Sequence, residues 1–327
     1  MSNKRLRIKV LVGGPSSEHE VSLKSGEQVL KNLNPERYEA ERVLIDKYGF
    51  WQKSPEEIKK DTDLVFIAMH GTYGEDGTVQ SMLDAVKLPY TGSSAPVSAL
   101  AMNKFVTART ASYHGLFTPL SFLISEREWT TRSVEVWRRV GPFLHFPVVI
   151  KPNNQGSSVG VVIAKNKEEA VKAMEEIFKI TNEALIQQFI KGRELTVGVL
   201  DYGWPGSEYA LPPTEIKPKT NHFFDYRAKY EIGASEEITP AHLGEAVTRL
   251  VQSAAKQLHK AVGARGFSRT DIILDEKNQP FILEINTIPG LTETSLLPQQ
   301  ATEAGVKFGE LLDRIIDASL GTKKNHL

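Results

Sequence analysis

Two carboxylates and a carboxamide near the end of the chain have the chemistry and spacing of a magnesium site. The apolar run 281–286 predicts a strand in which Glu284 and Asn286, two residues apart, lie on the same face. Asp271 begins an earlier apolar run, and the polar segment 275–279 between the runs predicts an antiparallel hairpin that places Asp271 opposite Glu284. Like charges directly opposed across two strands are destabilising unless a cation neutralises them. Oxygen ligands of these types suit Mg²⁺, and the alternative is an ordinary solvated hairpin end.

A loop rich in glycine and serine predicts a phosphate-binding element. Residues 153–160 join two apolar strands, and Gly156 and Gly160 allow backbone amides to approach a ligand closely. Lys151 lies at the end of the strand that enters the loop, so loop and lysine together can hold an anionic polyphosphate. A tight glycine hairpin beside a surface lysine is the alternative for the loop taken alone. Because the magnesium hairpin lies in the next predicted domain, the two elements can hold one nucleotide between two sheets.

The N-terminal part has the rhythm of a parallel α/β unit. Two short apolar strands, 6–12 and 64–69, are each followed by a glycine-bearing loop and then by sequence compatible with a helix. Ligands of such units bind at the carboxyl ends of the strands, which here means the loops 13–20 and 70–77. Neither loop has the GxGxxG pattern and the chain has no GxxxxGK[ST] segment, so the dinucleotide-binding and P-loop classes lose support.

The middle of the chain predicts a small α+β domain, about residues 103–190. Its predicted strands are 146–151, 161–164 and 184–190, and its predicted helix is 168–178. A further strand, 194–200, follows. The segment 205–235 is long, polar and rich in proline, lysine and tyrosine, which is typical of a functional lid.

The C-terminal part predicts two helices. Thr239 and Pro240 have the residue types of an N-cap and a first helical position, and Gly263 is a suitable stop. The apolar residues between them recur at helical spacing and predict one buried stripe, namely Leu243, Val247, Leu250, Val251, Ala254 and Leu258. A second helix is predicted at 308–319.

The composition excludes several classes of protein. The 327 residues include 40 basic and 40 acidic side chains, so no global field favours nucleic acid or an anionic membrane, and neither partner is expected. The absence of cysteine excludes disulfides, thiolate ligands and a thiol nucleophile. No apolar run reaches the roughly 20 residues that span a bilayer, and the N-terminal run is too short for a signal peptide. These features predict a cytoplasmic protein.

Several longer motifs resemble one family. The segments IKPNNQGSSVGV, GRELTVGVL, FFDYRAKY, GFSRTDIIL and LEINTIPGLTETSLLP occur in the order found in the D-alanine–D-alanine ligases of the ATP-grasp superfamily, and GGPSSEHEVS and HGTYGEDGTVQ match as well. The resemblance extends from Val10 to about Pro298. It implies an α/β fold of ATP-grasp type, with a parallel N-terminal α/β domain at 1–102 and two domains, 103–190 and 191–327, that grip ATP between antiparallel sheets.

The resemblance also implies an activity. ATP phosphorylates the carboxylate of one D-alanine, and the amine of a second attacks the acyl phosphate, which yields D-alanyl-D-alanine for peptidoglycan, ADP and phosphate. The implied cofactors are ATP and two Mg²⁺ ions, with Mn²⁺ as a substitute, and the implied assembly is a homodimer. One alternative is a ligase whose acceptor is D-lactate or D-serine, against which Lys229 and Tyr230 argue. The other is a nucleotide-binding scaffold without catalysis, against which the complete set of metal and phosphate residues argues.

The resemblance assigns the residues of the reaction centre. Its metal ligands match Asp271, Glu284 and Asn286, and its phosphate-binding lysines match Lys104 and Lys151. Arg269 and the backbone N–H of Gly290 match the groups that stabilise the tetrahedral intermediate. From the residues alone, Arg269 could instead form a salt bridge with the nearby acids.

The substrate residues are also implied by the resemblance. Glu18 matches the residue that binds the ammonium of the first D-alanine, and His70 lies near that substrate. Ser295 and the Leu296 amide match the binding site of the second carboxylate. Without the family, Glu18 is an acid at a helix N-terminus, His70 is a packing or hydrogen-bonding residue and Ser295 is an N-cap.

The nucleotide and lid residues complete the implied site. Gln187, the backbone of Gln188 and Ile190, and Glu194 match the positions that contact adenine and ribose, while Ser157, Ser158 and Lys229 match positions near the phosphates. Tyr230 matches the third member of a hydrogen-bonded trio with Ser157 and Glu18, and Tyr226 also lies in the lid. Gln187 departs from the family, which usually has glutamate there, although its carbonyl can still accept a hydrogen bond.

Overall fold

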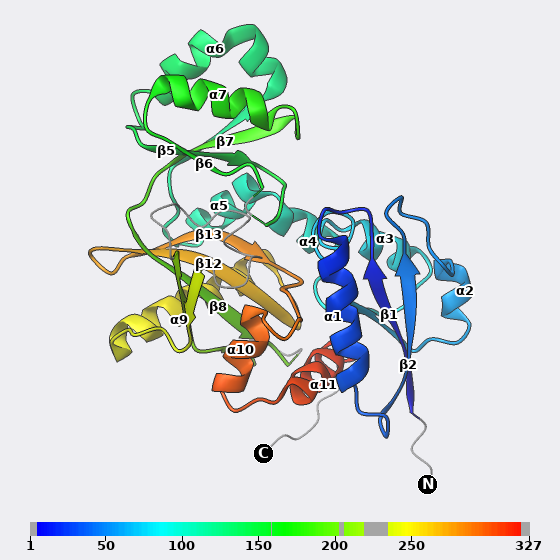
Figure 1. Ribbon diagram of the computed structural model, residues 1–327. Coiled ribbons are helices and arrows are strands. Elements are labelled where there is room, and N and C mark those ends of the chain that lie inside the picture. The colour runs from blue at the N-terminus through cyan, green and yellow to red at the C-terminus, as the bar shows by residue number, and fades with distance from the viewer. Residues whose placement is uncertain (1–4, 158, 203–205, 219–234, 322–327) are drawn as a thin grey trace.

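The computed structural model describes residues 5–157, 159–202, 206–218 and 235–321. Its strands form three separate sheets that follow one another along the chain (Figure 1). The first sheet is parallel, and the other two are antiparallel. The expected architecture, a parallel α/β unit followed by two units built on antiparallel sheets, is therefore confirmed.

The first sheet has the order β2-β1-β3. Its elements are β1 (Leu6–Gly13), α1 (His19–Asn32), β2 (Tyr38–Ile45), α2 (Pro55–Lys59), β3 (Leu64–Ile67), α3 (Thr78–Ala85) and α4 (Ala95–Met102). The predicted strands are confirmed as β1 and β3. The apolar pattern did not reveal β2, because this edge strand carries Glu39, Glu41 and Arg42. Since β1 and β3 are parallel neighbours, the loops that follow them meet, and the Ser16 hydroxyl donates to the His70 carbonyl at 2.7 Å.

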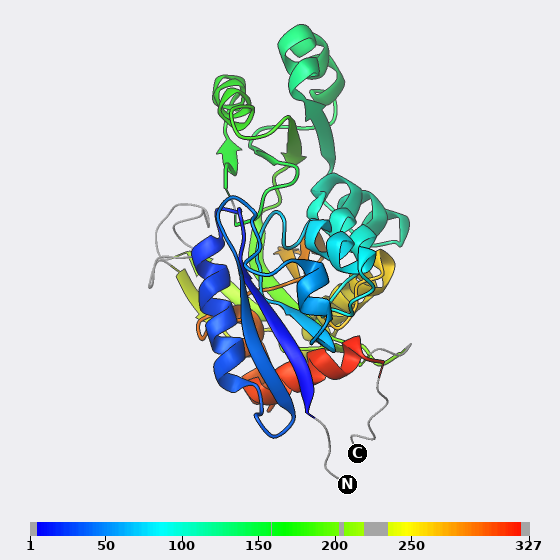
Figure 2. The same cartoon turned by 90° about the vertical axis from the view of Figure 1, so that its right-hand side faces the viewer.

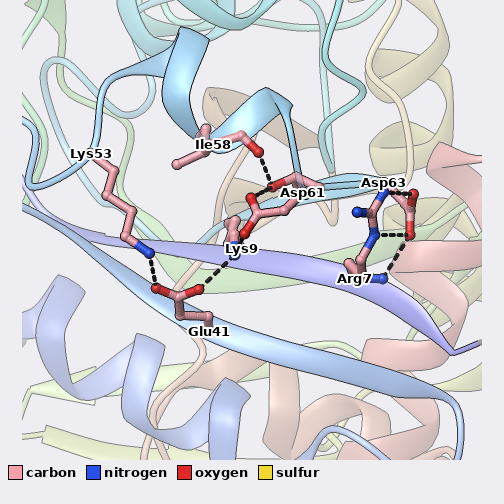
Figure 3. Close-up of polar contacts among 8 residues, drawn as sticks. Arg7, Lys9, Glu41, Lys53, Ile58, Asp61 and Asp63 are labelled. Atoms are coloured by element: carbon pink, nitrogen blue, oxygen red, sulfur yellow. Dashed lines mark hydrogen bonds and ion pairs between the residues drawn. The ribbon is translucent and has the colours of Figure 1, made fainter.

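A charged network crosses the middle of this sheet (Figure 3). The side chain of Lys9 on β1 is only 6% exposed, and its Nζ lies 2.6 Å from Glu41 Oε2 and 3.0 Å from Asp61 Oδ2. Burial lowers the pKa of Lys9, but the hydrogen bonds that its ammonium donates to the two acids outweigh burial and hold that pKa above its ordinary value. The buried Lys9 side chain therefore stays charged, and its ammonium points toward the partly exposed acids Glu41 and Asp61.

The second sheet has the order β4-β7-β5-β6 and is covered by two helices (Figure 1). After α5 (Lys104–Tyr113) come β4 (Ser121–Ser125), α6 (Glu126–Val140), β5 (Val148–Pro152), β6 (Val162–Ala164), α7 (Lys167–Ile177) and β7 (Glu183–Gln188). The three predicted strands and the predicted helix are confirmed as β5, β6, β7 and α7, with ends shifted by one or two residues. The aliphatic faces of the sheet and helices form one core, which includes Ile124, Ile150 and Met174.

The third sheet has the order β11-β10-β8-β12-β13, and β9 pairs with β8 beside this path. Its strands are β8 (Gly192–Leu200), β9 (Tyr209–Ala210), β10 (Thr214–Pro218), β11 (Ser235–Ile238), β12 (Phe267–Asp275) and β13 (Pro280–Asn286), and the helices are α9 (Glu245–Val262), α10 (Leu296–Glu303) and α11 (Phe308–Ser319). The predicted strand 194–200 and the predicted helix 308–319 are confirmed as β8 and α11.

The segment predicted to be a loop, 205–235, contains strands. It holds β9 and β10, and β11 begins at its last residue. The sequence did not predict these strands, because they are short and lie among proline and charged residues. β10 (Thr214–Pro218) is recognised as a strand by its pairing with β8 and β11. Residues 219–234 lie outside the described part of the chain.

The predicted start of the long helix is wrong. The N-cap of α9 is Gly244, and Thr239 instead bonds through its hydroxyl to Thr214 Oγ1 at 2.7 Å. Thr239 and Pro240 therefore lie in the connection between β11 and α9, and Thr239 links this connection to β10. Within α9 the stripe is buried at Val251, Ala254 and Leu258, but Leu250 is 44% exposed. The predicted end is confirmed, because Gly263 is the C-cap with a left-handed φ of 76°.

The β12-β13 hairpin has the predicted pairing of Asp271 with Glu284 but reaches it through a β-bulge. Near the turn, Ile272 pairs with Ile282, and the register shifts by one residue before Asp271. Leu283 is the extra residue on β13. Consequently Ile282 and Ile285 both lie in the core, and Leu283 and Glu284 both face a cleft. Without the bulge, the carboxylate pair would be out of register.

The C-terminal helices return to the first sheet. Leu312, Ile315 and Ile316 of α11 are fully buried in the same core as Ile8 of β1 and Val29 of α1. In Figure 2 the red helix α11 lies beside the lower end of the blue first sheet, in agreement with Figure 1. The first and third sheets are therefore joined by a shared apolar core, whereas the second sheet stands apart with its own core.

Candidate active site

A cleft lies between the second and third sheets and gathers most of the predicted nucleotide residues. The predicted residues that line it are Lys104, Lys151, Gln187, Gln188, Ile190, Glu194, Asp271 and Glu284. Val149 and Leu283 contribute apolar side chains. Asn286 lies in a small adjoining cavity together with Lys104 and Glu284. The hairpin and the glycine-rich loop therefore face one space, as the sequence predicts.

The predicted metal residues already contact cationic side chains. Asp271 accepts two hydrogen bonds from the Arg269 guanidinium, both 2.9 Å long, and one from the Thr196 hydroxyl at 2.7 Å. Glu284 Oε2 lies 3.2 Å from Lys104 Nζ. The salt bridge considered for Arg269 from the sequence is thus present. These two cations neutralise the opposed carboxylates of the hairpin.

The donor set can be tested against a hard cation. Asp271 and Glu284 supply carboxylate oxygens, and Asn286 supplies an amide whose buried Nδ2 has no hydrogen-bond partner among the described residues. In the same part of the chain, no three His, Cys, Asp or Glu side chains cluster as a metal site. Two carboxylates and one amide fit Mg²⁺, which takes its other ligands from water and phosphate.

Asn153 links the start of α5 to the glycine-rich loop 153–160. It is fully buried, its Oδ1 accepts from the Phe105 N–H at 3.0 Å, and its carbonyl accepts from the Lys104 N–H at 3.0 Å. The Lys104 ammonium then donates to the Gln155 carbonyl at 2.6 Å. The first turn of α5 is thereby attached to the loop that follows β5, and Lys104 and Lys151 are both held at the cleft, with exposures of 9% and 5%.

Glu18 joins the loop after β1 to the glycine-rich loop 153–160. The hydroxyl of Ser157 donates to Glu18 Oε1 at 2.5 Å. Glycine lets this carboxylate lie close to the backbone, because an added Cβ would lie 2.7 Å from Glu18 Oε2 at Gly71 and 2.9 Å from it at Gly156, so that Glu18 would have to move. Glu18 occupies the N-cap position of α1, but its side chain makes no capping hydrogen bond. Glu18 thus lies at the helix N-terminus, as the alternative explanation expects, and its side chain also contacts the loop 153–160.

His70 connects the first sheet to the loop after β13. Its Nδ1 lies 3.0 Å from the Ile288 carbonyl, and its Nε2 lies 2.7 Å from the Ser25 hydroxyl. Burial lowers the pKa of His70, against the opposing effect of the Glu18 carboxylate, so the ring is neutral near pH 7. In that state Nδ1–H donates to Ile288, and Nε2 accepts from Ser25.

Glu75 is a buried acid that the sequence analysis did not single out. Its carboxylate accepts from the Gly71 N–H at 2.7 Å and from the Ile288 N–H at 3.3 Å. Burial, with a contribution from the nearby Glu18, raises the pKa of Glu75 to about 8. Glu75 and His70 therefore bond to the two backbone polar groups of Ile288, its N–H and its carbonyl. The only available signal was its position in the loop 70–77.

The loop after β13 brings Gly290 close to Ser295. An added Cβ at Gly290 would lie 2.6 Å from Ser295 Oγ, so a side chain here would displace the Ser295 hydroxyl. Ser295 is the N-cap residue of α10, but its hydroxyl bonds to Thr292 Oγ1 at 2.7 Å and makes no capping bond. Leu296 begins α10. The amide of Gln300 fixes this helix on β8, accepting from the Gly198 N–H at 2.8 Å.

Comparison with known proteins identifies the family. Residues 7–62 and 52–93 match the family model described as D-ala D-ala ligase N-terminus, and residues 112–317 match the model described as D-ala D-ala ligase C-terminus. The chain belongs to the D-alanine–D-alanine ligase family. The mixed α/β architecture with two gripping antiparallel sheets is accordingly the ATP-grasp fold.

Individual relatives of this family match over nearly the whole chain. The D-alanine–D-alanine ligase of Pelotomaculum thermopropionicum is 39% identical over 96% of this chain and 97% of the relative, and that of Syntrophobacter fumaroxidans is 41% identical over 98% and 99%. Among solved structures, the VanG D-Ala:D-Ser ligase of Enterococcus faecalis has a TM-score of 0.85 at 28% identity over 97% of this chain and 100% of that chain. The ATP complex of the Bacillus anthracis D-alanine–D-alanine ligase has a TM-score of 0.80 at 31% identity over 97% and 98%.

Some residues assigned by the family resemblance cannot be placed. Ser158, Tyr226, Lys229 and Tyr230 lie outside the described residues. Of the trio that includes Glu18 and Ser157, the structure therefore describes one hydrogen bond, between those two residues.

None of the helices in the described ranges combines the length and apolar character needed to cross a membrane.

Proposed function

We propose that this protein is an ATP-dependent ligase that joins two D-alanines to D-alanyl-D-alanine and releases ADP and phosphate for peptidoglycan synthesis. The observation that carries the proposal is the meeting of three elements at one place. The glycine-rich loop contacts Glu18 of the first domain through Ser157, and the same loop borders the cleft that holds Lys151 and the β12-β13 acids. An amino acid bound at the first-domain loops would thus lie beside the phosphates of a nucleotide.

ATP fits the cleft between the second and third sheets. We assign adenine to Gln187, Gln188 and Ile190, ribose to Glu194, and the phosphates to the two lysines, Lys104 and Lys151, with Ser157, Ser158 and Lys229. Support comes from the ATP complex of the Bacillus anthracis relative and from one cleft that is lined by both lysines and by all the residues assigned to adenine and ribose. Positive charge at the phosphates stabilises phosphoryl transfer, in which positioning and electrostatics supply most of the catalysis.

Asp271, Glu284 and Asn286 are proposed to hold Mg²⁺, two ions in all, with Mn²⁺ as a substitute. When bound, the metal neutralises phosphate charge and aligns the γ-phosphate. Lys104 contacts Glu284 in the present structure, so that lysine is placed to exchange a carboxylate partner for a phosphate oxygen. Arg269 orients the Asp271 carboxylate by the bidentate hydrogen bond.

The first D-alanine is proposed to lie between Glu18 and Arg269. The Glu18 carboxylate binds the substrate ammonium, and His70 supports the neighbouring Ile288 loop. The substrate carboxylate then attacks the γ-phosphorus of ATP. Arg269 and the Gly290 N–H receive the negative charge that develops on the tetrahedral intermediate, and donors of this kind typically contribute roughly 3 kcal/mol each.

The second D-alanine is proposed to bind at the start of α10. The hydroxyl of Ser295 and the N–H of Leu296 hold its carboxylate, and its amine attacks the acyl phosphate. The lid residues Tyr226, Lys229 and Tyr230 are assigned to the exclusion of water, because an acyl phosphate open to solvent would hydrolyse. Tyr230 is further assigned to a hydrogen bond with the Glu18–Ser157 pair.

Three broader assignments accompany the activity. We propose that the chain divides into an N-terminal domain at 1–102, a central domain at 103–190 and a C-terminal domain at 191–327. We also propose that the protein acts in the cytoplasm as a homodimer, as the family resemblance implies. Equilibrium sedimentation of the purified protein tests the dimer, and a monomer at micromolar concentration would contradict it.

The activity is tested by phosphate release from ATP and Mg²⁺ with product identification by mass. D-alanine alone should give phosphate and D-alanyl-D-alanine in equal amounts, and L-alanine should give neither. D-lactate and D-serine are added in competition with D-alanine, because the similar VanG structure belongs to a D-Ala:D-Ser ligase. A dominant mixed product would reassign the acceptor, and the absence of phosphate release despite ATP binding would overturn the proposal.

A further inference from the structure

Gln187 is held by a hydrogen bond that also selects which of its atoms faces the cleft. The residue is 3% exposed, lies on β7 and pairs across the sheet with Ser121 of β4. Its Nε2 donates to Ser121 Oγ at 2.8 Å, and the Ser121 hydroxyl donates to the Pro119 carbonyl at 2.9 Å. Pro119 and Gln187 both line the nucleotide cleft.

The chain of hydrogen bonds has one direction. A serine hydroxyl carries a single proton, and here that proton is given to Pro119. Ser121 can then only accept from its other neighbour, so the Gln187 atom beside it must be the NH₂ group. The carbonyl oxygen is then the end of the amide that does not bond to Ser121, in a side chain that lines the cleft. The direction follows from the proton count on Ser121 and not from the similar shapes of the two amide ends.

A fixed direction is needed because glutamine can present either a donor or an acceptor. Rotation of the amide by half a turn exchanges its oxygen and its NH₂ group, whereas both oxygens of a carboxylate are acceptors. Gln187 would read an exocyclic amino group in one orientation and an exocyclic carbonyl in the other. A glutamine at this position therefore carries base selectivity only when a second residue orients it.

We propose that Ser121 is a specificity-determining residue of the nucleotide site, which orients Gln187 to accept from the amino group of adenine and to reject purines with a carbonyl there. This inference rests on the proposed function, which places the base of ATP beside Gln187. A 6-oxo purine would bring two acceptors face to face in a buried site. An unsatisfied buried pair of this kind costs on the order of tenfold to a hundredfold in affinity.

Equilibrium binding of ATP and inosine triphosphate, measured without D-alanine, tests the inference. The wild type should prefer ATP. Ser121→Ala should reduce the ratio of the two affinities by about tenfold, because the amide can then rotate to donate to the inosine carbonyl. Ser112→Ala is the matched control, since the Ser112 hydroxyl bonds to Thr118 outside the cleft, and it should leave the ratio unchanged.

A second background separates orientation from a structural role. Gln187→Glu places acceptors at both ends of the group, so Ser121→Ala added to that variant should leave the ratio unchanged. A non-additive effect of this kind reports direct coupling of the two side chains. Equal loss of both affinities in Ser121→Ala, or the same change of ratio in both backgrounds, would overturn the inference. Wild-type protein that binds ATP but makes no dipeptide would instead count against the proposed function alone.

Discussion

The buried acid Glu75 should make the folded protein less stable as the pH rises from about 5 to 8. Its ordinary pKa of 4.5 is raised to about 8 by burial and by the neighbouring Glu18. Between these two values the unfolded chain has released the proton, while the folded protein keeps it. Stability is therefore greatest below the ordinary value and is lost as the pH rises toward 8.

The magnitude follows from proton linkage. One proton retained on folding changes the free energy of unfolding by about 1.4 kcal/mol per pH unit. Between pH 5.5 and pH 7.5 the loss attributable to Glu75 is therefore about 3 kcal/mol. Above pH 8 the acid ionises in both states, and its contribution to the slope disappears.

Urea denaturation of the wild type and Glu75→Gln across this pH range measures the effect. Glutamine cannot titrate, so the difference in free energy of unfolding between the two proteins should shift by about 1.4 kcal/mol per pH unit in favour of the variant. Any constant cost of the amide is the same at every pH and does not affect this slope. Glu176→Gln, at an exposed glutamate, is the control and should follow the wild type. Parallel curves for the wild type and Glu75→Gln would refute the reasoning.

Three other substitutions test separate parts of the structure. Glu284→Gln should abolish phosphate release while the circular dichroism spectrum is unchanged, and an active variant would refute the metal assignment. Glu194→Ala should weaken ATP binding by about tenfold through the loss of a charged hydrogen bond, and equal affinity in a titration would contradict the ribose assignment. Lys9→Met should cost only about 1 kcal/mol in denaturation experiments, because Glu41 and Asp61 are 45% and 55% exposed and water can solvate them. A loss near 4 kcal/mol would show that these acids depend on the buried ammonium.

The hairpin illustrates how far the sequence could predict the site. The pairing of Asp271 with Glu284 followed from the position of a polar turn between two apolar runs, and the structure has that pairing. The bulge at Leu283 could not be predicted, because an extra residue in a strand is recognised only when the two flanking isoleucines are known to share one core. The prediction of the pair thus succeeded although the local register near the turn differs by one residue.

Tertiary contacts account for what the sequence did not reveal. Glu75 is surrounded by polar and glycine residues in a loop, and its burial arises when the Ile288 N–H from the other end of the chain reaches it. Thr239 has the local pattern of a helix start, but its hydroxyl bonds to Thr214 on a strand that was not predicted. Ser121 had no distinguishing pattern, because its role depends on a cross-strand neighbour in β7.

The shared core of the first sheet and α11 has a consequence for synthesis on the ribosome. Ile8 and Val10 of β1 leave the ribosome well before Leu312 and Ile316, which belong to the same core. The nascent first sheet therefore presents an uncovered apolar surface throughout elongation, and its completion waits for translation to reach α11. The second sheet and its helices contain their own core, whose residues are all synthesised before that point. The order of folding thus differs from the order of synthesis, and the nascent first sheet is exposed to misassociation until α11 is made.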